Sequence, residues 1–246
     1  MISINQKKYI KSLQQKKYRN LHKVFIVEGL KSIHDFLKSA YPLDIVYSTK
    51  ALDAVDQNKT VLVNQKELKS ISLLKHPKDA LAVFKIKENK ILPTSGFIIA
   101  LDDIQDPGNL GTIIRTADWF GVRDIVCSQN TVDCYNPKVI QASMGSLAHV
   151  NIFYVELENY LEKSSIPTYG AFMQGNSIYK ASVPNDMILV VGNEGNGIRE
   201  EIEKKIGNRL HIPAHKNSKA ESLNAAIATS VILGELHREK LRASSR

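Results

Sequence analysis

The stretch LDDIQDPGNLGTIIRTADWFG, residues 101–121, decides the fold of the larger part of the chain. It follows an apolar run, residues 97–101, that is typical of a buried strand, and a turn with one proline and two glycines comes next. Apolar residues then recur at helical spacing, with Asn109 predicted as the helix N-cap and a lone Arg115 among them. A strand, a loop and a helix in this order form the corner at which open α/β sheets place their active sites.

Strands and helices alternate along the rest of the sequence as well. Residues 1–87 are predicted to form a small α/β domain, residues 88–96 a polar linker, and residues 97–246 a second domain. The alternation is stronger in the second domain and favours a parallel sheet covered by helices on both faces, so the predicted fold class is α/β. We expect strands at 24–29, 43–48, 61–63, 81–86, 97–101, 124–127, 151–155, 168–172, 188–192 and 209–212. We expect helices from the N-terminus to Leu21 and at 110–120, 137–148, 157–164, 199–206 and 221–241.

The chain carries a formal net charge of +8, and much of this charge lies near the N-terminus. Residues 1–23 hold seven basic residues and no acidic one, whereas the remaining chain is close to neutral. Such a run is either the solvated face of a helix or an arm that contacts phosphates. The residues predicted to contact phosphates are Lys7, Lys8, Lys11, Lys16, Lys17 and Arg19.

Composition and missing motifs argue against several classes of protein. No apolar run approaches the roughly 18–20 residues that span a bilayer, and the N-terminal segment lacks the apolar core of a secretory signal. Two cysteines are too few for a disulfide framework or a zinc site, and the seven histidines show no metal-ligand spacing. No nucleophile elbow, P-loop or dinucleotide fingerprint occurs. We therefore expect a cytoplasmic protein with no metal, and with neither hydrolase nor nucleotide-cofactor dehydrogenase chemistry.

A second loop with chemical potential is GNEGNG, residues 192–197, directly after the apolar strand at 188–192. Its glycines allow a ligand to come close to the backbone, although a tight turn explains them equally well. Glu194 in this loop either caps a nearby helix or holds a cation, for which Arg115 is the candidate.

The third loop leads into the last helix through Glu221-Ser222-Leu223-Asn224. Helix capping alone explains Ser222 and Asn224. Each of the three loops follows a strand, however, so Arg115, Glu194, Ser222 and Asn224 are expected to converge at one edge of the sheet.

These three segments, in this order, resemble the three motifs of the SpoU (TrmH) family of RNA ribose 2′-O-methyltransferases, within the SPOUT superfamily. The matching text is NLGTIIRTADWFGV (109–122), ILVVGNEGNGI (188–198), and HIP (211–213) followed by ESLNAAIA (221–228). In the first domain, FIVEGLKSI (25–33) and HPKDALAVF (76–84) resemble the small substrate-binding domain common in this family. The resemblance therefore covers nearly the whole chain.

The resemblance implies a fold, a cofactor and a partner. The second domain would carry a C-terminal trefoil knot, the cofactor would be S-adenosyl-L-methionine, and the protein would be a homodimer whose site takes residues from both subunits. The implied cofactor-binding residues, acting mainly through backbone groups, are Gly192, Asn193, Gly197, Ile212 and Leu223. The implied catalytic set is Asn109, Arg115, Glu194, Ser222 and Asn224.

The implied function is methyl transfer to a ribose 2′-hydroxyl in structured RNA, with ribosomal RNA as the expected substrate. Transfer RNA is the alternative substrate, and a non-catalytic RNA-binding or ribosome-assembly protein with the same fold is the alternative function. The hydroxyl must lose its proton during attack. A guanidinium rarely loses a proton in proteins, so Arg115 is expected to act as an electrostatic clamp on the developing alkoxide or a neighbouring phosphate rather than as the base.

Two departures from the family pattern affect loop geometry. The third motif reads IPAHKNSKAESLN, with Ala214 where the family has methionine, no glycine, and a longer gap. We expect the 214–221 loop to be shaped differently around the cofactor or to contact RNA through its basic residues. In the first domain, Asp79 stands where the family commonly has glycine.

Overall fold

The computed structural model describes residues 2–87 and 91–244, with side chains up to residue 238. The chain forms two compact units, one of Met1–Glu88 and Asp133–His149, the other of Asn89–Val132 and Val150–Arg246. The sequence predicts a single second domain from residue 97 onward, whereas in the structure the segment 133–149 packs with the first unit. Of the expected linker, residues 88–90 lie outside the described residues.

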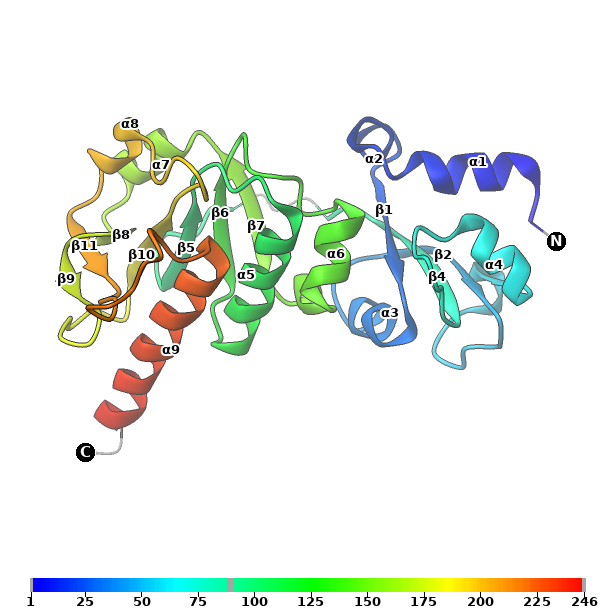
Figure 1. The fold of residues 1–246 in the computed structure, drawn as a ribbon. Coiled ribbons are helices and arrows are strands. Elements are labelled where there is room, and N and C mark those ends of the chain that lie inside the picture. The colour runs from blue at the N-terminus through cyan, green and yellow to red at the C-terminus, as the bar shows by residue number, and fades with distance from the viewer. Residues whose placement is uncertain (1, 88–90, 245–246) are drawn as a thin grey trace. The chain divides into compact units, whose positions relative to one another are not determined.

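The first unit contains a four-stranded sheet in the order β1-β4-β2-β3, of which Figure 1 labels β1, β4 and β2. Its strands are β1 (Val24–Glu28), β2 (Leu43–Ser48), β3 (Thr60–Leu62) and β4 (Ala80–Lys85). β4 pairs antiparallel with β1 and β2, and β2 pairs parallel with β3. Its helices are α1 (Ile4–Ser12), α2 (Lys16–His22), α3 (Leu30–Leu37) and α4 (Gln65–Ile71), with a 3-10 turn, η1 (Gln57–Lys59). The four strands lie within two residues of their expected bounds.

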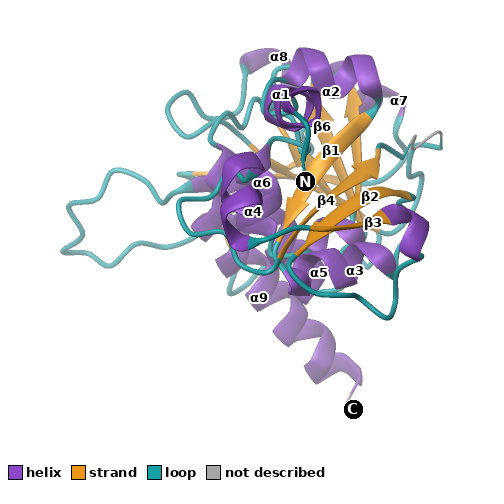
Figure 2. Ribbon diagram, turned by 90° about the vertical axis from the view of Figure 1, so that its right-hand side faces the viewer, coloured by secondary structure: helices purple, strands orange, loops and turns teal. Residues whose placement is uncertain are grey.

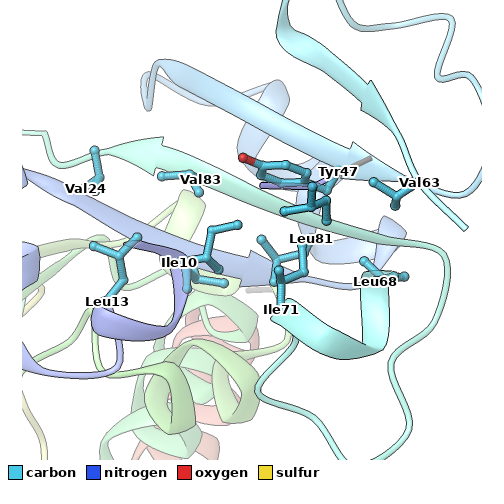
Figure 3. Close-up of a cluster of buried hydrophobic side chains, with 11 residues drawn as sticks. Ile10, Leu13, Val24, Tyr47, Val63, Leu68, Ile71, Leu81 and Val83 are labelled. Carbon is cyan, nitrogen blue, oxygen red and sulfur yellow. The ribbon is translucent and has the colours of Figure 1, made fainter. Parts of the chain in front are cut away.

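The predicted opening helix is two helices, because α1 ends in a turn before α2 begins. Ser3 starts α1 with a capping box, in which its hydroxyl accepts from the Gln6 amide and the Gln6 side chain accepts from the Ser3 amide. Ile10 and Leu13 point inward as predicted. Figure 3 shows them within an apolar cluster that also takes residues from β1, β2, β4 and α4.

The segment 133–149 joins the first unit through a buried ion pair and an aromatic contact. The Arg19 guanidinium donates to Asp133 Oδ2 from Nε at 3.1 Å and from Nη2 at 2.5 Å, and Nη1 donates to the carbonyls of Leu13 and Gln14. The Tyr135 ring packs 4.7 Å from the Phe25 ring, measured between centroids. Arg19 is only 2% exposed, so its prediction as a phosphate contact is wrong for the folded chain: its charge is neutralised inside the unit.

Helix α6 (Pro137–Ser143) in this segment is shorter than the predicted helix 137–148. Met144 and Gly145 both take positive φ values, 52° and 96°, which end the helix before the 3-10 turn η2 (Ser146–Ala148). Apolar periodicity continues across this break, and for that reason the pattern alone predicts one helix.

The second unit contains a seven-stranded sheet in the order β7-β6-β5-β10-β8-β11-β9, and every pair in it is parallel. The prediction of a parallel sheet is thus confirmed. The strands are β5 (Phe97–Leu101), β6 (Asp124–Ser128), β7 (Asn151–Val155), β8 (Thr168–Phe172), β9 (Asn176–Ser177), β10 (Met187–Val191) and β11 (Asn208–His211). Of these strands only β9, which has two residues, is not predicted from the sequence.

Helices cover both faces of this sheet, as predicted. On one face, Ile98, Ala100, Ile188 and Val190 pack with residues of α7 (Leu157–Lys163) and α8 (Glu200–Glu203). Strand alternation turns the intervening side chains toward α5 (Pro107–Trp119) and α9 (Ala225–Ser244). Figure 2 shows α7 and α8 above the strands and α5 and α9 below them.

α5 and α9 pack directly against each other (Figure 1). Thr116 Oγ1 and Ser230 Oγ lie 3.1 Å apart, and the rings of Phe120 and His237 are 5.5 Å apart between centroids. Among the described residues, no helix is long and apolar enough to cross a membrane.

Candidate active site

The strand order brings three loops to one edge of the second sheet. β5 and β10 are neighbours near its centre. From β5 the chain runs outward through β6 and β7 on one side, and the later strands β8 to β11 lie on the other side. In open α/β sheets, such a reversal of strand order opens a crevice beyond the carboxyl ends of the strands. The loops that leave β5, β10 and β11 carry the predicted site residues.

The first loop places the Asn109 side chain differently from the prediction. Asp106 is the N-cap of α5, with its Oδ1 accepting from the Asn109 amide at 2.9 Å, and Pro107 occupies the first helical turn. Asn109 is therefore not the cap. The side chain of an N-cap residue turns back onto its own helix. Because Asn109 is not the cap, its side-chain amide group is available for other contacts.

Asn109 bridges the other two loops. Its Nδ2 donates to Glu194 Oε1 at 2.6 Å, and its Oδ1 accepts from Asn224 Nδ2 at 2.9 Å. Asn224 also caps α9, because its Oδ1 accepts from the amides of Ala226 and Ile227 at 2.9 and 3.3 Å. The three residues Glu194, Asn109 and Asn224, which we call the Asn109 bridge, connect all three loops. Of the four residues expected to converge, the structure brings Glu194 and Asn224 together in this way.

Arg115 does not join the Asn109 bridge. The prediction that it pairs with Glu194 is therefore wrong for the described structure, in which Glu194 accepts from Asn109 instead. The Arg115 guanidinium is exposed and makes no hydrogen bond or ion pair with any residue that the structure describes. The same holds for the exposed hydroxyl of Ser222. Arg115 follows Asn109 by six residues, which turns its side chain about 120° around the helix axis from Asn109. It shares an exposed helix face with Trp119, four residues later.

The second loop is closed tightly on itself. The Asn193 amide donates to the Gly197 carbonyl at 2.9 Å, and the Gly197 amide donates back to the Asn193 carbonyl at 3.0 Å. A Cβ on Gly192 would lie 2.3 Å from the Gly197 carbonyl carbon and from the Ile198 nitrogen. Glycine is therefore required at position 192 by the backbone that folds over it.

The Asn193 side chain is occupied within the protein. Its Nδ2 donates to the Asp103 carbonyl at 2.7 Å, and its Oδ1 accepts from the amides of Gly195 and Asn196. The Asn193 amide is occupied as well, by the Gly197 carbonyl, so only the Asn193 carbonyl could accept a further hydrogen bond from a cofactor. Of the other predicted cofactor residues, Ile212 is partly exposed, and Leu223 is 48% exposed in the third loop.

The structure also reveals a pair of residues that the sequence analysis did not single out. Asp102 is completely buried at the end of β5, and the Arg199 guanidinium donates to its Oδ1 from Nε and Nη2 at 2.9 and 2.7 Å. The hydrogen bond with Asp102 raises the pKa of Arg199 above its ordinary value. Asp102 is visible in the sequence as the end of a strand, but nothing local in the sequence points to Arg199 as its partner.

A cavity elsewhere in the second unit does not include the candidate residues. It has a volume of 390 Å³ and is lined by residues 92–94, 155–156, 159–160 and 163–165, with the Tyr160 hydroxyl donating to the Pro93 carbonyl at 2.8 Å. Among the described residues, no group of three histidine, cysteine, aspartate or glutamate side chains is arranged to hold a metal ion.

Comparison with known proteins assigns the three-loop arrangement to a family. The model of the SpoU rRNA methylase family matches residues 96–234, and the model of the MRM3-like substrate-binding domain matches residues 5–82. The chain belongs to the SpoU rRNA methylase family. The SpoU match spans the Asn109 bridge and Arg115, and the second match spans most of the described part of Met1–Glu88.

Relatives of this SpoU-family chain include a named enzyme and two solved structures of similar length. The 23S rRNA (guanosine(2553)-2′-O)-methyltransferase RlmP of Bacillus subtilis is 30% identical over 234 residues, which are 92% of this chain and 93% of RlmP. A TrmH-family protein from Porphyromonas gingivalis is 39% identical with a TM-score of 0.90, over 97% of this chain and 99% of that one. An rRNA methyltransferase from Sinorhizobium meliloti, solved with AdoMet bound, is 27% identical with a TM-score of 0.88, over 97% of each chain.

Proposed function

We propose that this SpoU-family protein transfers a methyl group from S-adenosylmethionine to a ribose 2′-hydroxyl of ribosomal RNA. The observation that carries the proposal is the Asn109 bridge, which joins the three motif loops at one edge of the parallel sheet. Full-length similarity to RlmP, whose name states 2′-O-methylation of 23S rRNA, supports this reaction and makes 23S rRNA the first substrate to test.

The loops that follow β10 and β11 suit S-adenosylmethionine. Gly192, with the backbone of Asn193 and Gly197, forms a turn in which the Cβ of any other residue at 192 would clash. Ile212 and Leu223, at the ends of the third loop, would offer apolar surface to the adenine ring of this cofactor. When bound, S-adenosylmethionine supplies an electrophilic methyl group on a sulfonium.

We assign Arg115 the role of stabilising the negative charge that develops on the ribose oxygen during methyl transfer. A fixed guanidinium stabilises an alkoxide or an adjacent phosphate better than it removes a proton. Its lack of partners among the described residues leaves its five donors available to RNA. Ser222 lies in the third loop, where its hydroxyl would orient the ribose, while Asn224 holds Asn109 and the start of α9.

We also propose that the protein works as a homodimer. Trp119 on α5 is 84% exposed and Ile227 on α9 is 51% exposed, and the two helices pack side by side. Exposed apolar side chains on two neighbouring helices are the kind of residues from which a contact with a second protein chain is built. Arg115 lies on the same face of α5 as Trp119, so a partner subunit seated there would bring its own cofactor loops to Arg115.

We propose that the first unit binds the RNA, with the lysines of α1 and α2 contacting its phosphates. Lys8 and Lys11 are exposed on α1, Lys16 and Lys17 are exposed on α2, and Lys7 on α1 is partly exposed. Arg19 is left out of this arm because it is buried against Asp133. An enzyme that modifies ribosomal RNA acts where ribosomes are made, so we place it in the cytoplasm.

Two measurements test the proposed function. Isothermal titration with S-adenosylmethionine separates the enzyme from a non-catalytic RNA-binding protein, since only the enzyme needs this cofactor. Mapping of 2′-O-methyl groups in total RNA from a strain without the gene should show the loss of one site in 23S rRNA. Loss of a site in transfer RNA would instead identify the alternative substrate, and an unchanged methylation map with no cofactor binding would contradict the proposal.

Arg115→Lys tests the role of the guanidinium. Lysine keeps the charge but lacks the planar fork, so we expect kcat to fall by about 100-fold, the usual size for a misplaced electrostatic stabiliser, with little change in cofactor affinity. Near-normal turnover would show that a positive charge alone is sufficient. Arg123→Lys, at an exposed ion pair with Asp118 before β6, is the matched control.

A further inference from the structure

Asp102, the first residue after β5, is completely buried together with its carboxylate. A buried charge is costly unless it is paired and hydrogen-bonded. Arg199 supplies all three contacts that the structure gives this carboxylate: its amide donates to Oδ2 at 2.8 Å, and its Nε and Nη2 donate to Oδ1 at 2.9 and 2.7 Å. One residue, held through both its backbone and its side chain, is thus fixed to the end of β5.

The next residue, Asp103, holds the start of the loop of residues 192–199, whose end is held by the Asp102–Arg199 pair. Asp103 adopts a left-handed conformation with φ of 57°, which an aspartate takes up only at some energetic cost. Ser128 at the end of β6 holds it there, accepting from the Asp103 amide at 2.9 Å and donating to Asp103 Oδ1 at 2.6 Å. The Asp103 carbonyl then accepts from Asn193 Nδ2 at 2.7 Å.

The loop between these two anchors carries Glu194. Asn193 is fixed to Asp103 at the start of the loop, and Arg199 is fixed to Asp102 just past its end. In between, the Asn193–Gly197 hydrogen bonds set the shape of the turn, and Glu194 reaches Asn109. The position of Glu194 therefore depends on the two aspartates, although neither of them contacts it.

We propose that Asp102 and Arg199 are positioning residues for the proposed methyl transfer. They hold the 192–199 loop so that the Gly192 backbone and the Asn109 bridge form a cofactor site before any ligand binds. This inference rests on the proposed function, because it concerns the same site. Neither residue is assigned a contact with RNA or with the reacting atoms.

The test is a cofactor-binding and kinetic comparison of Arg199→Lys with Arg123→Lys. Lysine at 199 keeps the charge that Asp102 needs but loses the two-donor contact of Nε and Nη2, so the chain should fold with a looser loop. We expect the Kd of S-adenosylmethionine to rise about tenfold, the effect of one lost charged hydrogen bond, while the Kd for RNA stays the same. The Arg123 control should leave both constants unchanged.

A double-mutant cycle gives the second readout. If Arg199 acts through the Asn109 bridge, combining Arg199→Lys with Asn109→Ala should weaken cofactor binding less than the product of the two single effects. If the lysine variant does not fold, Asp102→Asn, which keeps the shape of the side chain and removes its charge, takes its place and should likewise raise the Kd of S-adenosylmethionine.

The outcomes separate this inference from the proposed function. If the wild-type protein binds no S-adenosylmethionine, the proposed function itself fails. If the wild-type protein binds it and the variants lower only the melting temperature, with Kd and kcat unchanged, Asp102 and Arg199 serve the fold alone and the inference is overturned. Fully multiplicative effects in the cycle would likewise overturn it.

Discussion

At the scale of single residues, the function of Asn109 depends on which residue caps α5. Asp106 and Asn109 are both good N-cap residues, and the apolar pattern does not choose between them. The proline at 107 does choose, since proline prefers the first position of a helix and so points to Asp106 as the cap. With Asp106 in that role, Asn109 becomes the residue that connects the other two loops.

Gly192→Ala should damage both the fold and the cofactor site. The added methyl would lie 2.3 Å from the Gly197 carbonyl carbon and 2.4 Å from its oxygen, and backbone cannot move aside as a flexible side chain can. We expect the free energy of unfolding to fall by about 1–3 kcal/mol, the usual cost of overpacking, and cofactor binding to be lost. Urea unfolding and isothermal titration measure the two effects.

Gly207→Ala is the matched control for that experiment. Its Cβ would meet nothing closer than Thr168 Oγ1 at 3.8 Å, so its unfolding free energy should stay within about 0.5 kcal/mol of the wild-type value. Equal behaviour of the two alanine variants would mean that the 192–197 turn can open without cost, contrary to the geometry described here.

Glu28→Gln should change how stability depends on pH. Burial raises the pKa of Glu28 above its ordinary value, and hydrogen bonds from Ser72 and Leu73 offset this only in part. A group whose pKa is higher in the folded state stabilises the fold fully below its unfolded pKa, and this contribution is lost as pH rises through the folded pKa.

The wild-type protein should therefore lose unfolding free energy relative to Glu28→Gln as the pH is raised from about 4 to about 7. Urea unfolding at several pH values measures the difference. Parallel stability curves for the two proteins would show that Glu28 has the same pKa in the folded and unfolded states.

At the scale of elements, the sequence predicts most strands and helices because their apolar periods are clear. It fails where one residue overrides the period. The φ of 52° at Met144 ends α6 early, and the Leu13–Gln15 turn divides the opening helix into two. Asp79, at a position where the family resemblance suggests glycine, adopts a left-handed φ of 62°, the conformation that glycine takes most readily.

Charge patterns are less informative than apolar patterns, as Arg19 illustrates. In the sequence it is one of seven basic residues in a run. Nothing near it indicates that its partner is Asp133, which lies more than a hundred residues away. Long-range ion pairs of this kind cannot be derived from local spacing. The Asp102–Arg199 pair was missed for the same reason.

Replacing Lys7, Lys8, Lys11, Lys16 and Lys17 with glutamine should weaken RNA binding and reduce its salt dependence. Each lost phosphate contact lowers the slope of log K against log salt by about 0.7–0.9. The Kd for ribosomal RNA fragments at several salt concentrations measures this slope. Replacing five exposed lysines elsewhere in the first unit, Lys50, Lys66, Lys69, Lys75 and Lys78, gives a control of equal charge change. Equal slopes for the two variants would make the arm a solvated helix face.

At the scale of the whole molecule, Arg115 and the Asn109 bridge lie on different faces of α5. A single subunit gives the Arg115 guanidinium no partner among the described residues. Twofold symmetry would bring Arg115 of one subunit to the loops of the other through the surface around Trp119 and Ile227. The dimer and the trefoil knot of the second domain remain predictions from the family resemblance, because local sequence patterns carry no information about either.

Trp119→Glu should produce a folded monomer with little methyltransferase activity. A charge in the centre of an apolar interface opposes association, whereas on a surface residue it leaves the fold intact. Sedimentation velocity measures the subunit number, and the melting temperature confirms folding. A variant that stays dimeric would show that the interface does not depend on Trp119. A wild-type protein that is monomeric and active would place the active site within one subunit.

The central claim is that three loops of one parallel sheet form a site for ribose methylation. It is tested most directly by incubating unmodified 23S rRNA with the protein and S-adenosylmethionine that carries a deuterated methyl group, followed by mass spectrometry of the nucleosides. We expect one 2′-O-methylated nucleoside with the deuterium mass shift, present with the wild-type protein and absent with Asn109→Ala. A label on a base, or no label although the cofactor binds, would contradict it.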